Sequence, residues 1–165
     1  MKIFVTITLA LLLSGCGLTQ STPANSSLSS LEIEQDVPVL VDHPDPDFVP
    51  NSTGGVLFFA ADLRDATGTK IGELIGQVTT FDVTIDGVDE VDNFREMVFN
   101  MEDGMIVVLG AAQYVAGTEP NFADDNAPVT AVIVGGTDTF VGVRGTVTTT
   151  KRANGTLLHE FEFVD

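Results

Sequence analysis

Arg144 is the side chain in this 165-residue chain that most directly suggests binding chemistry. It lies between Gly142 and Gly145 in the run VIVGGTDTFVGVRGTV, residues 132–147, which we predict to be strand, glycine corner and strand. A guanidinium offers a planar set of donors, so on a long strand at a cavity mouth it can hold a carboxylate or a phenolate. The alternative is an ion pair with an acid on an adjacent strand. The candidate partners are Asp62, Glu73 and Glu160.

Asp62 is the second candidate for catalysis, because it is an acid at the end of a predicted apolar strand. Its alternative role is to cap the hairpin turn that follows. Four further residues are candidates to contact a ligand. They are Gln77, Tyr114, Phe140 and His159. The pattern around His159 also suits a buried histidine with satisfied hydrogen bonds, and Tyr114 can equally pack with its hydroxyl at the barrel rim.

Familiar catalytic and metal-binding motifs are absent from the sequence. The two histidines are far apart, so they make neither a recognisable zinc site nor a triad. The segment 142–145 is predicted to continue as strand rather than open a helix, which excludes a phosphate-binding loop. We therefore expect no metal and no cofactor.

The elements that must position these residues are all predicted to be strands. No segment has a convincing helical period, and the pairs Asp103-Gly104 and Asn154-Gly155 are typical of hairpin turns. The predicted strands cover residues 55–63, 70–85, 94–102, 105–115, 129–134, 139–151 and 156–164, with a short edge strand or extended arm at 37–41. Glycines inside long strands mark bends, so an all-β fold is expected, and a closed or nearly closed antiparallel barrel is favoured over a sandwich.

The N-terminal residues indicate targeting rather than structure. A lysine and a short apolar run precede Leu-Ser-Gly-Cys, which is similar to a bacterial lipobox. We therefore predict a lipoprotein signal peptide at 1–15, lipidation of Cys16 and a location in the bacterial cell envelope; an ordinary secretory signal is the alternative. Residues 16–50 are rich in Ser, Thr, Pro and acids, and we predict a flexible acidic tether there, followed by the folded domain at 51–165.

The charge of the chain limits its partners. The formal net charge is −17, with seven Lys and Arg in total. Nucleic acid is not expected as a partner, because phosphate binding needs a basic face. The same charge disfavours docking of the folded domain on anionic lipid, so membrane contact is expected through the lipid anchor only.

Three stretches in order, KIGELIGQV, MVFNMEDGMIVVLG and AVIVGGTDTFVGVRGTV, resemble the allene oxide cyclase and dirigent-protein family, including its bacterial dirigent-like members. The similarity covers about residues 54–165, and Asp138 stands where dirigent proteins have the last glycine of GGTG. The resemblance implies an eight-stranded antiparallel β-barrel with a central apolar cavity, and a homotrimer as in plant relatives.

The activity of the plant cyclases does not carry over with the fold. Their glutamate and cysteine are missing, because Ala60 and Asp62 stand at the two positions that match the glutamate and asparagine of those enzymes, and Val78 stands at the position of the cysteine. Three functions remain: a barrel that binds a small hydrophobic molecule; an isomerase or cyclase that guides ring closure or coupling of a bound intermediate by confinement; and a structural or interaction module with a filled barrel. The first is preferred, since it assumes no chemistry that the residues fail to show.

Overall fold

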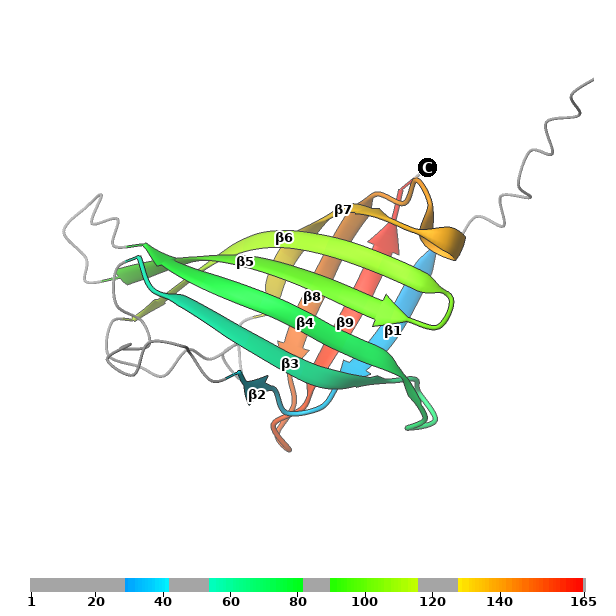
Figure 1. Cartoon of the computed structure of the whole chain (residues 1–165), viewed down its shortest axis with the longest axis horizontal. Coiled ribbons are helices and arrows are strands. Elements are labelled where there is room, and N and C mark those ends of the chain that lie inside the picture. Colours follow the sequence, from blue (N-terminus) through cyan, green and yellow to red (C-terminus); the bar gives the residue numbers. More distant parts are fainter. Residues whose placement is uncertain (1–28, 42–53, 82–89, 116–127, 165) are drawn as a thin grey trace, which may run out of the picture.

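The computed structural model describes residues 29–41, 54–81, 90–115 and 128–164, and nearly all of them lie in strands (Figure 1). The strands, in chain order, are β1 (Ser30–Gln35), β2 (Val39–Leu40), β3 (Val56–Arg64), β4 (Lys70–Phe81), β5 (Glu90–Met101), β6 (Gly104–Val115), β7 (Val129–Gly136), β8 (Gly145–Lys151) and β9 (Leu157–Phe163), with a single 3₁₀ turn, η1 (Asp138–Phe140), between β7 and β8.

The strands form one closed antiparallel barrel. The sheet order is β1-β9-β8-β7-β6-β5-β4-β3-β2, and an additional pairing of β1 with β3 joins the ends, so that eight strands make the ring. Two hairpins that the sequence predicted are present, and Gly104 and Gly155 have the positive φ angles, 131° and 87°, that such turns require. The predicted all-β barrel is confirmed.

The barrel closes at a narrow seam between β1 and β3. β1 pairs with β9 along its whole length but with β3 at only two positions, Glu34 with Arg64 and Gln35 with Leu63. Beyond them the Asp36 amide donates to the Asp62 carbonyl at 2.9 Å, and β2 continues the pairing along β3.

This seam corrects one boundary from the sequence. The stretch predicted as tether, 16–50, contains β1 and β2, so the barrel begins at Ser30 rather than near residue 51. The β1 residues alternate between solvent and core, with Ile33 and Gln35 fully buried, and this burial is what draws the segment into the sheet. Residues 1–28 and 42–53, which include the predicted signal peptide and Cys16, lie outside the described residues.

Alternating residues of each strand fill the interior. Gly76 on β4 faces inward, and a Cβ there would overlap the ring of Phe59, so the aromatic side chain occupies the space that this glycine leaves. The fully buried apolar side chains are Ile33, Phe59, Leu63, Leu74, Phe99, Ile106, Val108, Val147 and Phe161.

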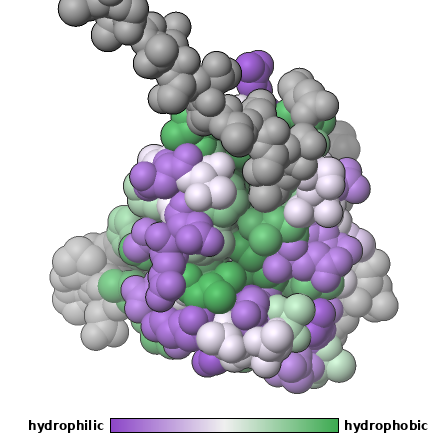
Figure 2. Space-filling view, turned by 90° about the vertical axis from the view of Figure 1, so that its right-hand side faces the viewer, coloured by the Kyte–Doolittle hydropathy of each residue, from purple (hydrophilic) through white to green (hydrophobic). Residues whose placement is uncertain are grey.

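The glycine corner differs from its prediction. The strand expected over 139–151 starts only at Gly145, because the chain first makes η1 and a turn. Asp138 has a φ of 53°, in the left-handed region that few side chains adopt. The corner is held against β6 by hydrogen bonds in both directions between Met105 and Thr137, at 2.9 and 3.0 Å, and this positions Phe140 in the core. Seen from this end, hydrophobic residues lie in the middle of a largely hydrophilic surface (Figure 2).

Candidate ligand pocket in the barrel interior

The barrel interior has two parts of different chemistry. The part nearest the β5–β6 hairpin is packed with apolar side chains, among them Phe99 and Phe161, whose rings meet edge to face with centroids 5.0 Å apart. We call it the apolar half. The part towards the β8–β9 turn holds the buried polar residues, and we call it the polar half. Its members are Gln35, Thr80, Asn93, Arg95, Thr149 and His159.

His159 is the centre of the polar half. Its position on β9 places it opposite Thr149 on β8, and Gln35 approaches from β1 on the other side. The ring Nδ1 lies 2.8 Å from the Thr149 hydroxyl, and Nε2 lies 2.8 Å from the Gln35 Oε1 atom. The edge of Phe99 packs against the ring, with centroids 4.9 Å apart.

Burial decides the protonation state of this ring. His159 is completely buried, and the loss of solvation lowers its pKa to about 3, so the imidazole is neutral at physiological pH. Because Gln35 Oε1 can only accept, Nε2 carries the ring proton and Nδ1 accepts from the Thr149 hydroxyl. Both ring nitrogens are thus occupied, and His159 holds Gln35 in place rather than acting as a free base.

Two buried amides in this half have a donor group without a partner among the described residues. Gln35 uses its oxygen for His159, and its Nε2 group has no hydrogen bond. Asn93 accepts from the Thr80 hydroxyl at 3.3 Å, and its Nδ2 group has none. Both side chains are only 1% exposed, and buried donors of this kind are rare in protein cores.

Arg95 brings a positive charge into the same region. It lies on the inward face of β5 with Met97 and Phe99, and it is 6% exposed. The residues opposite it are Val78 on β4 and Gly110 on β6. Arginine is seldom buried to this extent, so an inward guanidinium is a strong sign of a specific polar environment.

The hydrogen-bond ladder between β6 and β7 ends beside Arg95. β6 pairs with β7 only as far as Leu109 with Val132, although β6 continues to Val115 and β7 begins at Val129. The small residues Gly110 and Ala131 lie just beyond the last pair and still pack against each other, since a Cβ on Gly110 would come within 2.8 Å of the Ala131 Cβ. We call this interruption of the hydrogen-bond ladder the β6–β7 opening.

A pocket lies beneath this opening, with a volume of about 10 Å³. That is room for about one water molecule or one oxygen atom of a ligand. The pocket is lined from the interior by Gln35, Arg95, Met97, Thr149, Leu157 and His159, and at the opening by Gly110, Ala111, Val129 and Ala131.

Of the suggested residues whose side chains the structure describes, His159 is the one placed in this pocket, where it takes part in the hydrogen-bond network. Asp62 and Gln77 lie on the outer face of the barrel instead. Asp62 forms an ion pair with Lys70 at 2.8 Å, and Gln77 donates to Glu96 at 2.9 Å. They take no part in the pocket, because alternate residues of a strand point to opposite faces.

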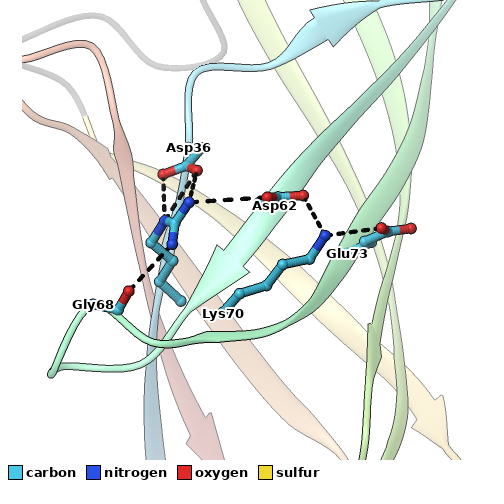
Figure 3. A network of polar contacts seen from close by, with 6 residues as sticks. Asp36, Asp62, Gly68, Lys70 and Glu73 are labelled. Carbon is cyan, nitrogen blue, oxygen red and sulfur yellow. Dashed lines mark hydrogen bonds and ion pairs between the residues drawn. The ribbon is translucent and has the colours of Figure 1, made fainter.

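Asp62 belongs to a polar network on the outside of the seam (Figure 3). Arg64 donates to both carboxylate oxygens of Asp36, with the shortest contact at 2.7 Å, and Lys70 bridges Asp62 and Glu73. The hydrogen bond from Arg64 lowers the pKa of the Asp36 carboxyl. This network fastens β1 to β3 and offers no concave site towards the interior.

Of the remaining predicted residues, Arg144 and Phe140 are also separate from the pocket. Arg144 is exposed, precedes β8 rather than lying on it, and forms no ion pair with a described residue, while its backbone carbonyl accepts from the Val164 amide. Phe140 is buried in the hydrophobic core near the β5–β6 hairpin. Tyr114 lies on β6 opposite Val91, but its side chain is outside the described residues.

The fold and pocket define a small closed β-barrel with a buried polar site. No family model matches the chain, and no curated protein matches it, so the allene oxide cyclase and dirigent resemblance is unconfirmed. Among solved structures, the chain is similar to a pyocyanin demethylase, at 20% identity and a TM-score of 0.56, over 82% of this chain and 99% of that one. It is also similar to the Diels Alderase AbmU from Streptomyces koyangensis, at 15% identity and a TM-score of 0.51, over 86% and 72%. At these identities the likeness shows the fold alone.

Membrane-spanning helices and metal-binding groups are absent from the residues that the structure describes. Within them, no helix has the length and apolar character needed to cross a membrane. No three of their His, Cys, Asp or Glu side chains are grouped so as to hold a metal ion.

Proposed function

We propose that this protein is an envelope-anchored barrel lipoprotein that binds a small, mainly hydrophobic molecule in its interior. The observation that carries the proposal is the Gln35 amide donor, which is buried beside Arg95 under the β6–β7 opening and has no partner among the described residues. An interior that only fills space is more stable with apolar side chains at such positions. A bound molecule would supply the missing acceptor.

The pocket as it stands accommodates the polar end of a ligand rather than a whole molecule. Two features allow it to enlarge. β6 and β7 are not paired beyond Leu109, so they can separate there without losing ladder hydrogen bonds. Met97 lines the pocket, and its unbranched side chain can adopt several shapes. The body of the ligand would then lie in the opening, between Ala111 and Val129.

The anchoring part of the proposal depends on the N-terminal sequence. The lipobox-like Cys16 would carry acyl chains, and the residues before Ser30 would link them to the barrel, with no other membrane contact. Mass spectrometry of the mature N-terminus tests this: an acylated Cys16 supports the anchor, and cleavage at another site without acylation contradicts it.

Catalysis is an alternative within the same pocket. The two solved barrels named above are described as a demethylase and a Diels Alderase, so related folds host chemistry on small molecules. Here the Arg95 guanidinium and the Gln35 amide could stabilise an oxygen that gains negative charge while the barrel holds the molecule in one conformation. An isomerase or cyclase would therefore act by confinement and hydrogen bonding.

A structural or interaction module is the second candidate function, and the pocket volume of about 10 Å³ favours it. Under this alternative the polar half of the interior holds only water, and no ligand enters it. A homotrimer, taken from the family resemblance, is compatible with either function.

Native mass spectrometry of the protein from its own host distinguishes these functions. We expect an added mass that disappears on denaturation and is absent from the variant Ala131→Leu, which fills the opening. Thr130→Leu, on the outward face of the same strand, is the matched control and should retain the ligand. Absence of any added mass across several growth conditions would leave the structural module.

A further inference from the structure

We propose that the pocket selects molecules that present an acceptor oxygen, such as a carbonyl or carboxylate oxygen, to the Gln35 amide and the Arg95 guanidinium. The inference rests on the proposed function, since it specifies which small molecules the interior takes. The inference concerns whether the pocket takes hydrogen-bond acceptors or hydrogen-bond donors of a ligand. The mainly apolar lining does not by itself determine this.

The Gln35 amide lies with its oxygen towards His159. Its Oε1 accepts from the His159 ring, which is itself held by the Thr149 hydroxyl and the edge of Phe99. The opposite amide direction would need the other ring tautomer, with Nδ1 donating to the Thr149 hydroxyl and Nε2 accepting from the Gln35 NH₂ group. In the direction observed, the Nε2 group of Gln35 points away from His159, has no hydrogen bond among the described residues and lies in a pocket that Gln35 lines.

The other polar groups of the pocket reinforce this polarity. Arg95 can only donate hydrogen bonds, and the Thr149 hydroxyl donates its hydrogen bond to His159 Nδ1. No carboxylate is among the lining residues, whereas the described acids of the neighbouring strands, such as Glu96 and Glu160, point outward. A ligand N–H group entering here would meet donors, while a ligand oxygen would meet the Gln35 NH₂ group, which has no acceptor among the described residues, and the donor groups of Arg95.

The size of the pocket agrees with this assignment. About 10 Å³ is enough for one oxygen atom and too little for a ring or a branched alkyl group. The acceptor would enter first, and the apolar body would remain in the β6–β7 opening beside Gly110 and Ala131.

The test compares small probes of equal shape on the intact protein with [¹³C]methyl-methionine labels, read by NMR. Met97 lines the pocket, and Met105 is 37% exposed near the opposite end of the barrel, so the two methyl signals separate pocket binding from surface binding. The probes are acetophenone, α-methylstyrene, in which CH₂ replaces the carbonyl oxygen, and benzylammonium. Benzoate extends the series to an anionic oxygen.

We expect acetophenone or benzoate to shift the Met97 signal without moving Met105, and α-methylstyrene to bind about ten-fold more weakly because a hydrogen bond to a buried donor is lost. Benzylammonium should not bind. Equal binding of acetophenone and α-methylstyrene would overturn the inference but keep the proposed function. If no probe shifts Met97 and native mass spectrometry finds no ligand, both are overturned.

Two substitutions sharpen the result. Gln35→Met removes the pocket donor and should weaken acetophenone binding about ten-fold. Gln77→Met makes the same change on the outer face of β4 and should leave binding unchanged. If Gln35→Met fails to fold, the two isosteric probes on the unmodified protein still decide the question.

Discussion

The two halves of the barrel interior solve the same packing problem in opposite ways. In the apolar half, Phe99 and Phe161 pack edge to face within a cluster of buried apolar side chains, and the ring of His159 meets Phe99 at the border with the polar half. In the polar half, charges and amides occupy equivalent inward positions on the same strands, and two amide donors lack partners among the described residues. The comparison indicates that one half provides stability and that the other gives up stability for a specific arrangement of donors.

Strand β5 shows the change within a few residues. Its inward side chains are Asn93, Arg95, Met97 and Phe99, in order from the polar half to the apolar half. The wall changes at the same level, because the pairing of β6 with β7 stops at Leu109, next to the residue opposite Arg95. Buried polar side chains and the end of the β6–β7 ladder thus occur at the same level of the barrel.

The largest expected effect comes from truncating the apolar half. Phe99→Ala should lower the free energy of unfolding by about 3–5 kcal/mol, because it leaves a dry cavity among rigid neighbours. Met97→Ala, two residues away, should cost less, about 2 kcal/mol, since its cavity would join the pocket and admit water. Urea unfolding of both variants measures the difference. Equal losses would mean that the two halves are packed alike.

A second prediction uses the pH dependence of the polar half. The pKa of His159 is about 3 in the folded barrel and about 6.5 in the unfolded chain, so below pH 6.5 only the unfolded state takes up the proton. Stability should therefore fall by roughly 1.4 kcal/mol for each pH unit between about 6.5 and 3. The depressed pKa of Asp36 adds to this loss only at lower pH, as that carboxyl is protonated.

His159→Phe should remove this slope. At pH 7 the variant should be less stable by about 1–3 kcal/mol, because Thr149 and Gln35 lose their hydrogen-bond partner. The difference in stability between His159→Phe and the unmodified protein should shrink as the pH falls. Thr149→Val is the control, since it removes a hydrogen bond but keeps the buried imidazole and hence the slope. Urea unfolding midpoints of the two variants, measured from pH 7 to 5, give the pH dependence of each. A pH dependence that persists in His159→Phe would contradict its assignment to His159.

Much of the fold could be predicted from the sequence because its signals are local. Alternating residues and hairpin glycines indicate strands whatever the partner strand is, and the order of hairpins favours a barrel. β1 could not be found in this way. Its six residues, SLEIEQ, border a polar segment, and they become a strand only because β9 and β3 lie beside them in the folded chain. Gln35 was missed for the same reason.

The candidate site was predictable only in part. The histidine could be singled out because it alternates with apolar residues on a predicted strand. The face of each strand could not be assigned, so the sequence predicts Asp62 as a catalytic residue and Gln77 as a ligand contact, although both point outward. Arg95 carried a usable signal: it shares the period of Met97 and Phe99, so any strand that buries these two residues also buries the arginine.

The smallest expected effect lies outside the barrel, at the seam network of Asp36 and Arg64. Both side chains are about one-third exposed, so their pairing is weakened by solvent and by salt. Arg64→Met should lower the urea midpoint slightly at low ionic strength and hardly at all near about 1 M NaCl, where the screening length is only about 3 Å. The loss caused by Thr149→Val should not depend on salt, because Thr149 and His159 are buried. A salt-independent loss in Arg64→Met would instead show that closure of the barrel at the seam depends on this one ion pair.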